Sequence, residues 1–218
     1  MMIGDGAGII LIFGVVALII IGRQFLAYRK NVKIQLKADI LGGTFIILFA
    51  ATVLLLMGRL PWCSCNEIWL WSGDIFSEHN SQHIFDPYTF THFIHGVLFY
   101  ALIWLFGKRL PFGLRLLLAV GIESAWEIIE NTDAVIGYYR ANTVSLGYYG
   151  DSVINSVSDI LAMAVGFWFS YRFRVLASIL ALVTIEIFLA FWIKDNLTLN
   201  ILMFIHPFEF IKNWQLRP

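Results

Sequence analysis

The run Pro111-Phe-Gly-Leu-Arg-Leu-Leu-Leu-Ala-Val-Gly-Ile-Glu-Ser-Ala-Trp-Glu-Ile-Ile-Glu-Asn131 is mostly apolar and long enough to cross a bilayer as a helix. About 20 helical residues, at about 1.5 Å each, span the roughly 30 Å hydrocarbon core. Glu123, Glu127 and Glu130 interrupt this run at positions i, i+4 and i+7, which share one helical face. Carboxylates are costly at this depth, so the stripe marks a candidate site.

Comparable apolar runs recur along the chain. Of its 218 residues, 59% are hydrophobic and 14% are charged, and the mean hydropathy is +0.77. This composition leaves more apolar surface than a globular protein of this size can bury. The sequence therefore predicts an all-α fold, a polytopic membrane helix bundle that forms one domain over residues 1–218. The six predicted transmembrane helices lie near residues 5–22, 39–57, 87–107, 111–131, 151–171 and 175–193.

The ends of these runs carry helix signals. Asp86 and Asp151 stand where two of the helices begin and can cap them. The first run lacks a small-residue cleavage site, which indicates an uncleaved anchor. The stretch 197–211 is apolar but short and contains Pro207, so we expect a short C-terminal interfacial or re-entrant helix.

The basic residues are distributed unevenly between the two sides of the predicted bundle. One side receives Arg23, Arg29, Lys30, Lys33, Lys37, Lys108, Arg109, Arg115, Arg172 and Arg174. The other side receives Arg59, Arg140, Lys194, Lys212 and Arg217, together with loops at about 58–86 and 132–150. Because cytoplasmic loops are enriched in Lys and Arg, the second side is predicted to be the outer one. Both termini are then expected outside, on the periplasmic side in a bacterium.

Four ionisable residues on different helices fall at a similar depth in this topology. We place His95, Glu123, Asp159 and Glu186 about 10–12 Å below the outer surface. His92, Glu127 and Asn155 lie about one turn shallower, and Glu130 and Asp151 lie at the rim. No Lys or Arg accompanies the carboxylates, so they must be protonated, paired with histidine or bound to a cation. Three polar stripes on three helices can thus converge into one pocket that opens to the outside.

Polar residues also hold membrane helices together, and this explanation suits Asn155 and the nearby serines. It suits carboxylates less well, because each costs about 2.5–3.5 kcal/mol at mid-membrane on insertion scales. We therefore interpret Glu123, Glu127, Asp159 and His95 as functional. Glu186 stands alone on its helix, so for this residue a functional role and a role in holding helices together are evenly matched.

The chemistry of these residues suggests a membrane-embedded enzyme that acts on a lipid or lipid-linked substrate at the outer leaflet. His92 or His95 would serve as a general base in a hydrolysis or group transfer. Glu123, Glu127 and Asp159 would orient the histidines or, with them, bind a divalent metal ion. The expected substrate-binding residues are Arg140, Asp151, Asn155, Glu130 and His83. No nucleophile motif or His-Glu-x-x-His accompanies them, so the reaction class stays open between hydrolase and transferase.

A non-catalytic role is the alternative. The same groups could bind or pass a proton, a metal ion or a lipid, or the chain could support a larger membrane complex. The inner half of each predicted helix is almost free of ionisable residues, which favours an outward-facing site over a proton path. Membrane lipids and a second copy of the chain are the expected partners. Nucleic acid is excluded, because no basic stripe or reader motif occurs.

The first outer loop has signals of its own. Cys63 and Cys65 are too close for a relaxed disulfide, and two thiols alone do not form a zinc site. A strained bridge, a bridge between two chains and buried free thiols all stay open. His79 and His83 follow in the same loop, where a solvated loop is an equal alternative to a functional one.

Several short motifs resemble those of an uncharacterised family of bacterial inner-membrane proteins. The motifs are Cys63-x-Cys65, Asn80-Ser-Gln-His83, His92-x-x-His95-Gly96, Glu123-x-x-Trp126-Glu127-x-x-Glu130-Asn131, Tyr139-Arg140, Gly150-Asp151-Ser152-x-x-Asn155-Ser156-x-x-Asp159, Asp195-Asn196 and Trp214-Gln215. The resemblance covers about Gly58 to Gln215 and implies an integral protein of the bacterial inner membrane. It implies no activity. A fainter likeness to VanZ-like membrane proteins is only an analogy.

Overall fold

The computed structural model describes residues 3–30, 35–143 and 147–216, and these residues form nine helices and no named strand. Lys33 and Arg217, which entered the topology prediction, lie outside these ranges. Six of the helices are long: α1 (Ile3–Arg29), α2 (Gln35–Leu56), α3 (Thr89–Gly107), α4 (Phe112–Glu130), α6 (Val153–Arg172) and α7 (Val175–Trp192). They match the predicted runs, except that α1 continues to Arg29 instead of ending near residue 22.

Among the described residues, five of these helices are long and apolar enough to cross a membrane, namely α1, α2, α3, α6 and α7. Their outward side chains are apolar, as Leu18, Phe106 and Phe191 illustrate with exposed fractions of 69%, 86% and 86%. A surface of this kind is stable against lipid and not against water. The prediction of an all-α, membrane-type bundle is therefore confirmed. Helix α4 has a similar length but carries four charged residues: Arg115, Glu123, Glu127 and Glu130.

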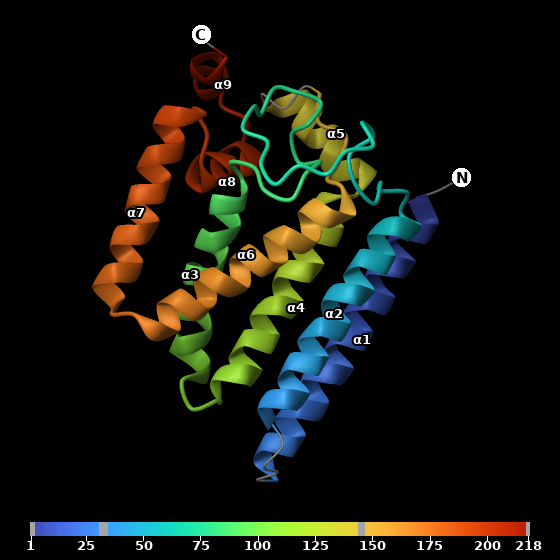
Figure 1. Cartoon of the computed structure of the whole chain (residues 1–218), viewed down its shortest axis with the longest axis vertical. Helices are drawn as coiled ribbons and strands as arrows, with labels where there is room; N and C mark the ends of the chain where they lie inside the picture. The colour runs from blue at the N-terminus through green and yellow to red at the C-terminus, as the bar shows by residue number, and fades with distance from the viewer. Residues whose placement is uncertain (1–2, 31–34, 144–146, 217–218) are drawn as a thin grey trace.

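Figure 1 shows how the helices are arranged. Helices α1 and α2 run side by side along one edge, and α7 lies at the opposite edge. Helix α6 crosses α3 and α4 obliquely between them. The start of α1, the 58–86 loop and the C-terminal helices all lie at one end of the bundle, which we call the loop end. The apolar core joins α1, α2, α4 and α6 through Phe13, Ile46, Leu54, Leu117 and Phe167.

The crossing of α3 and α6 depends on two glycines. A Cβ atom on Gly96 would collide with the backbone of Met163 and Phe167, and one on Gly166 would collide with the backbone of Phe93. Membrane helices approach this closely only where small residues face each other. The crossing brings the histidine face of α3 against the Asp159 face of α6.

Two predictions about irregular segments are wrong in detail. The stretch predicted as a loop over 132–150 contains helix α5 (Asp133–Asn142), whose first turn is capped by the Thr132 hydroxyl. The tail forms two helices, α8 (Leu197–Ile205) and α9 (Glu209–Gln215), instead of one. Helix α8 ends before Pro207, because the residue that precedes a proline is held in an extended conformation, as His206 is at φ −152° and ψ 114°.

The 58–86 loop caps the start of α6. Backbone carbonyls of Leu60, Pro61 and Ser81 accept hydrogen bonds from three successive N–H groups, those of residues 152–154. The first N–H groups of a helix have no partner inside it, so the loop supplies what the helix lacks. The N-cap of α6 is Ser152 and not the predicted Asp151. The N-cap of α3 is Tyr88 and not the predicted Asp86, but the Asp86 carboxylate accepts hydrogen bonds from the backbone N–H of Tyr88 and of Thr89 at the start of the helix.

Candidate functional site

Two histidines of α3 share one carboxylate of α4. The Nδ1 atom of His92 lies 2.6 Å from Glu123 Oε1, and the Nδ1 atom of His95 lies 2.9 Å from the same oxygen. The Glu123 side chain is fully buried. The predicted convergence of α3 and α4 is therefore present, and its closest contacts join the two histidines to Glu123.

These contacts fix which ring nitrogen of each histidine is available. A carboxylate only accepts hydrogen bonds, so each Nδ1 carries the proton that it shares with Glu123. In a neutral ring the lone pair is then on Nε2. His95 lines a cavity, and the described residues give its Nε2 no partner. A carboxylate on one nitrogen and a free lone pair on the other is the arrangement of a general base or a metal ligand.

Two further carboxylates complete the cluster. Glu127 Oε1 lies 3.4 Å from His92 Nδ1, and Asp159 Oδ2 of α6 lies 3.9 Å from His92 Nε2. Three of their oxygens, both of Glu127 and Oδ1 of Asp159, accept no hydrogen bond from the described side chains and backbone groups. Buried oxygens in this condition need a proton or a cation. We call His92, His95, Glu123, Glu127 and Asp159 the membrane cluster.

A cavity of about 500 Å³ adjoins the membrane cluster. His92, His95 and Asp159 belong to its wall, whereas Glu123 and Glu127 lie behind the histidines. The wall comes from α3, α4, α5, α6, α8 and the loops at the loop end. It consists of Asn80, Ser81, Tyr88, Thr91, His92, His95, Leu98, Phe99, Ile122, Trp126, Glu130, Tyr139, Tyr148, Asp151, Asp159, Leu197, Asn200, Ile201, Phe204 and Ile205.

Part of this wall faces the outside of the bundle. Leu98 of α3, Ile122 of α4, and Ile201 and Ile205 of α8 line the cavity, yet their exposed fractions are 41%, 45%, 48% and 75%. Side chains that are both lining and exposed mark where a cavity reaches the surface. All four are aliphatic, so this margin of the cavity suits hydrocarbon.

The polar rim of the cavity is formed at the loop end. Asp151 accepts hydrogen bonds from Asn131 Nδ2 at 2.7 Å and from the Tyr148 hydroxyl at 3.0 Å. Burial raises the pKa of Asp151. Burial, followed by the neighbouring carboxyl groups of Glu130 and Asp151, raises the pKa of the Tyr139 hydroxyl. The rim therefore offers neutral hydroxyl groups beside carboxyl groups.

Four residues singled out in the sequence lie elsewhere. Asn155 and His83 do not line the cavity: the Asn155 side chain donates to the His83 carbonyl oxygen at 3.0 Å and ties the loop to α6. Arg140 is exposed on α5 and is also absent from the wall. Glu186 accepts hydrogen bonds from the N–H groups of Leu197 and Thr198 and caps α8 instead of joining the cluster.

Sequence reasoning missed two contributions to the wall. Tyr139 faces the cavity in place of Arg140, since consecutive helical residues point about 100° apart. The available signal was its position three residues after the apolar Ile136, which puts the two side chains on one helical face. Helix α8 supplies five wall residues with helical spacing: Leu197, Asn200, Ile201, Phe204 and Ile205. That stripe is visible in the sequence.

The half of α4 that points away from the loop end has an apolar buried face. Arg115 was assigned to the inner connection, but it is buried within α4, with its guanidinium carbon 5.4 Å from the Tyr100 ring centroid. Between Arg115 and Glu123 the buried residues of α4 are Leu117, Ala119, Val120 and Gly121. This part of the described chain offers no polar path along α4 from the membrane cluster to the end opposite the loop end.

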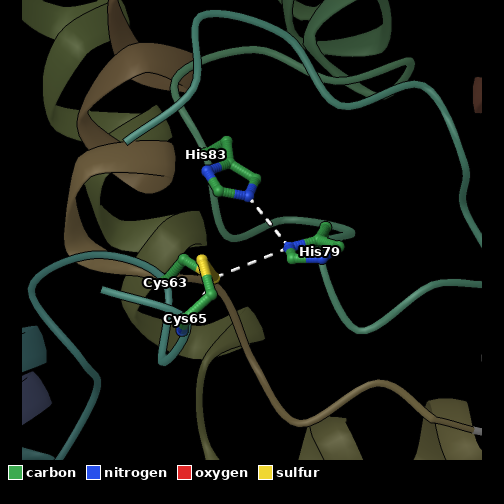
Figure 2. A group of neighbouring side chains, drawn as sticks. All are labelled: Cys63, Cys65, His79 and His83. Atoms are coloured by element: carbon green, nitrogen blue, oxygen red, sulfur yellow. Dashed lines mark hydrogen bonds between the residues drawn. A yellow bond between two sulfur atoms is a disulfide. The ribbon is translucent and has the colours of Figure 1, made fainter. Parts of the chain in front are cut away.

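A second group of ligand-type side chains lies in the 58–86 loop. Cys63 and Cys65 are joined by a disulfide within the chain, one of the three alternatives left open by the sequence. His79 Nδ1 lies 3.7 Å from Cys63 Sγ and 3.1 Å from His83 Nε2 (Figure 2). We call these four residues the loop cluster. None of them lines the cavity.

The family described as "Protein of unknown function (DUF2585)" matches residues 54–217. The chain belongs to this family. A UPF0314 protein of Paracoccus denitrificans is 51% identical over 170 residues, which cover 78% of this chain and 88% of that protein. A UPF0314 protein of Brucella anthropi is 46% identical over 78% of this chain and 86% of that protein, and one of Rhizobium meliloti is 52% identical over 73% and 81%. No solved structure matches the chain.

These findings confirm the resemblance to an uncharacterised bacterial family. The matched range begins near the end of α2, so it contains both clusters and the whole cavity wall and omits α1 and most of α2. Two of the motifs, Asn80-Ser-Gln-His83 and Gly150-Asp151-Ser152, are joined by hydrogen bonds. Gln82 Nε2 donates to the Gly150 carbonyl oxygen at 2.8 Å, and the Ser152 hydroxyl donates to the Gln82 carbonyl oxygen at 3.1 Å.

Proposed function

We propose that the chain is a membrane-embedded enzyme that acts on a lipid or lipid-linked substrate at the outer leaflet of the bacterial inner membrane. In this proposal α4 is the sixth transmembrane helix, and the loop end and both termini face the periplasm. The observation that carries the proposal is the pair of imidazoles that Glu123 orients from behind while His92 and His95 line the cavity.

The chemistry follows from the division of labour within the membrane cluster. Glu123 stabilises positive charge on either imidazole, so His95 can take a proton from water or a hydroxyl group through Nε2. The proton can return to the leaving group from the same nitrogen. Hydrolysis or group transfer at a phosphate or acyl centre needs this step. The acceptor is water in one case and a second substrate hydroxyl in the other.

The cavity wall supports a lipid substrate. Its aliphatic margin at Leu98, Ile122 and Ile201 suits an acyl or prenyl chain that enters from the bilayer. Its polar end, with Tyr139, Tyr148 and Asp151, suits a head group. A substrate placed in this way has its chain toward the exposed margin and its head group toward the loops, with the histidines beside the junction.

A comparison of lipids tests the proposal. Lipid extracts of cells that lack the protein are compared with extracts of cells that express the wild-type chain, His95→Gln or Glu123→Gln. We expect one lipid or lipid-linked species to change when the protein is lost, and we expect only the wild-type chain to restore it. His206→Gln and Glu209→Gln are matched controls, since both residues are exposed and absent from the cavity wall.

The outcome is decisive in both directions if the variants are present in the membrane at wild-type level. Restoration by His95→Gln and Glu123→Gln to the same extent as by the controls would contradict a catalytic role. An unchanged lipid extract in cells without the protein would remove the lipid substrate from the proposal.

The donor-free oxygens favour a second candidate function, a site that binds a divalent cation. Glu127 and Asp159 present three such oxygens next to His92. A metal there could activate water in the enzyme or could be the ligand of a non-catalytic binding protein. Elemental analysis tests for the cation: the metal content of the purified wild-type protein is compared with that of Glu127→Gln and of the control Glu209→Gln. Metal lost only in Glu127→Gln supports the cation, and a metal content equal in the two excludes it.

A further inference from the structure

The loop cluster gathers four metal-ligand side chains away from the cavity. The Sγ atoms of Cys63 and Cys65 and one ring nitrogen each of His79 and His83 lie within 4.8 Å of one another. Figure 2 shows that both contacts of His79 within the cluster end on the same nitrogen, Nδ1. This group needs an explanation of its own, because the membrane cluster does not use it.

The distances in the loop cluster resemble the edges of a zinc tetrahedron. With Zn–N bonds of about 2.0–2.1 Å and Zn–S bonds of about 2.3 Å, two nitrogen ligands lie about 3.3–3.4 Å apart, and nitrogen and sulfur ligands lie about 3.5–3.6 Å apart. The separation of His79 Nδ1 and His83 Nε2 is 3.1 Å, and that of His79 Nδ1 and Cys63 Sγ is 3.7 Å. The spacing His79-x-x-x-His83 is also a common zinc spacing.

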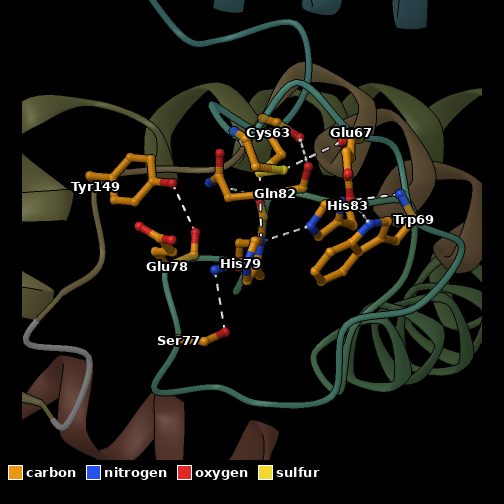
Figure 3. The surroundings of a disulfide bond; sticks show 12 residues. Cys63, Glu67, Trp69, Ser77, Glu78, His79, Gln82, His83 and Tyr149 are labelled. Atoms are coloured by element: carbon orange, nitrogen blue, oxygen red, sulfur yellow. Dashed lines mark hydrogen bonds between the residues drawn. A yellow bond between two sulfur atoms is a disulfide. The ribbon is translucent and has the colours of Figure 1, made fainter.

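The loop holds these side chains in place before any ion binds. The Trp69 ring lies against both imidazoles, with centroid separations of 4.4 Å to His79 and 4.4 Å to His83 (Figure 3). Cys63 and His83 are 2% and 1% exposed. Ligands fixed by their surroundings lose little freedom on binding a metal, which favours an ion site.

We propose that the loop cluster binds one Zn²⁺ as a two-cysteine, two-histidine site when the Cys63–Cys65 disulfide is reduced. A dithiol reductant supplies two electrons and two protons to the S–S bond and becomes a disulfide itself. The bond breaks and leaves two thiols. Zn²⁺ then displaces both thiol protons and forms two Zn–S and two Zn–N bonds. Oxidation reverses these steps and releases the ion, so the site binds Zn²⁺ only when both thiols are reduced.

The hydrogen bonds of the oxidised form show what zinc must replace. The backbone N–H of Trp69 donates to His83 Nδ1 at 3.2 Å, so the neutral His83 ring carries its proton on Nε2 and donates it to His79 Nδ1. Zinc takes both facing lone pairs, and the His83 proton moves to Nδ1.

Zinc binding therefore costs two hydrogen bonds, the one from Trp69 to His83 and the one from His83 to His79. Four bonds to a divalent ion outweigh these two hydrogen bonds, so the reduced cluster favours the ion. A purely structural disulfide is the competing explanation. It is weak here, because a bridge over one intervening residue closes a very short loop and constrains the unfolded chain little.

Cobalt substitution tests the proposal. The full-length protein in detergent is reduced with a dithiol, freed of metal and reductant under anaerobic conditions, and titrated with Co²⁺. We expect one equivalent of Co²⁺ to give thiolate-to-metal charge-transfer bands and tetrahedral ligand-field bands, and we expect one equivalent of Zn²⁺ to remove them. The unreduced protein should show no charge-transfer bands. Glu123→Gln should behave as the wild type, which separates this site from the membrane cluster.

Ligand variants decide between the four-residue site and simpler ones. Cys65→Ser and His79→Asn change the less buried cysteine and histidine of the cluster, and His206→Asn is the matched control. We expect a loss of Co²⁺ affinity of at least ten-fold in the first two and none in the control. X-ray absorption of the zinc form should give two sulfur and two nitrogen neighbours.

Three results would overturn the proposal. One is a disulfide that the dithiol does not open in the folded protein. Another is reduced protein without thiolate bands at one equivalent of Co²⁺. The last is wild-type affinity in His79→Asn, which would leave a thiol pair without its histidines.

Discussion

Two pairs of histidines occur within the family-matched part of the chain, and their neighbours differ. His92 and His95 on α3 turn their Nδ1 atoms toward the buried carboxylate of Glu123, and both line the cavity. His79 and His83 in the loop face each other across 3.1 Å, next to a disulfide and an indole ring. The residue type is the same, and the partner of each ring decides its chemistry.

The difference teaches how the two clusters divide their roles. A carboxylate behind an imidazole stabilises the charged ring and leaves the other nitrogen to act on a ligand. Two imidazoles that share one proton next to two sulfur atoms lie outside the wall of the described cavity and suit a single ion. We therefore propose reaction chemistry for the membrane cluster and ion binding for the loop cluster. The following predictions test this division.

The largest expected effect is on turnover by the membrane cluster. His95→Gln and Glu123→Gln should each reduce the rate at which the affected lipid changes by about 10²–10⁴-fold, the usual contribution of a positioned acid–base group. The double variant should be no slower than the slower single variant, because the two residues act as one unit. Lipid mass spectrometry over time after induced expression measures these rates.

The same variants should leave the Co²⁺ spectrum of the loop cluster unchanged. Fully additive losses in the double variant would show that Glu123 and His95 act independently, and a changed cobalt spectrum would show that the two clusters are not separate.

A carboxylate that belongs to neither cluster shows what burial does by itself. Burial raises the pKa of Asp195 to about 7, against hydrogen bonds from Tyr88, Asn196 and Gln215. The folded chain then holds a proton that the unfolded chain has lost, so stability falls as pH rises from about 4 to about 7. Asp195→Asn should flatten this dependence, by at most about 4 kcal/mol.

Thermal unfolding in detergent between pH 4 and pH 8 measures the Asp195 effect. An identical pH profile in wild type and Asp195→Asn would contradict it. The Co²⁺ spectrum at fixed pH serves as the control, since Asp195 is remote from the loop cluster in sequence and has no contact with it in the described structure.

The packing of the membrane cluster can be disturbed without touching a polar residue. Gly166→Val places side-chain atoms against the backbone of Phe93 and should separate α6 from α3. Overpacking of this kind costs about 1–3 kcal/mol. We expect a lower unfolding temperature and impaired lipid turnover, with Co²⁺ binding retained. Gly137→Val is the control, because nothing lies within 4 Å of a Cβ there.

The smallest effect is expected at Glu186, which the sequence placed at the depth of the membrane cluster. Its carboxylate instead caps α8, so Glu186→Gln should cost about 0.5–2 kcal/mol of stability and leave lipid turnover intact. A loss of turnover as large as that of Glu123→Gln would return Glu186 to the cluster.

Much of the architecture could be predicted from the sequence, because long apolar runs have one stable form in a bilayer. The polar stripe of α4 and the His92/His95 pair could be predicted from helical spacing alone. The partners of the remaining residues could not. Whether Asn155 binds a substrate or ties down a loop depends on where the 58–86 loop folds. Backbone hydrogen bonds, which carry no residue pattern, hold that loop together with hydrogen bonds of the Gln82, Ser152 and Asn155 side chains.

The same limit applies to Arg140 and to the loop cluster. Charge drew attention to Arg140, whereas the rotation of α5 turns Tyr139 toward the cavity. Cys63 and His79 are 16 positions apart, and only the folded loop brings their side chains to 3.7 Å.

The central claim is that a bilayer lipid enters the cavity through its aliphatic margin and reaches His92 and His95. Photo-crosslinking in nanodiscs with a phospholipid that carries a photoreactive acyl chain tests it most directly. We predict crosslinks at Leu98 and Ile122, lost in Ile201→Trp, while crosslinks at the lipid-facing Leu41 persist. Equal labelling of the three positions in Ile201→Trp and wild type would contradict the claim.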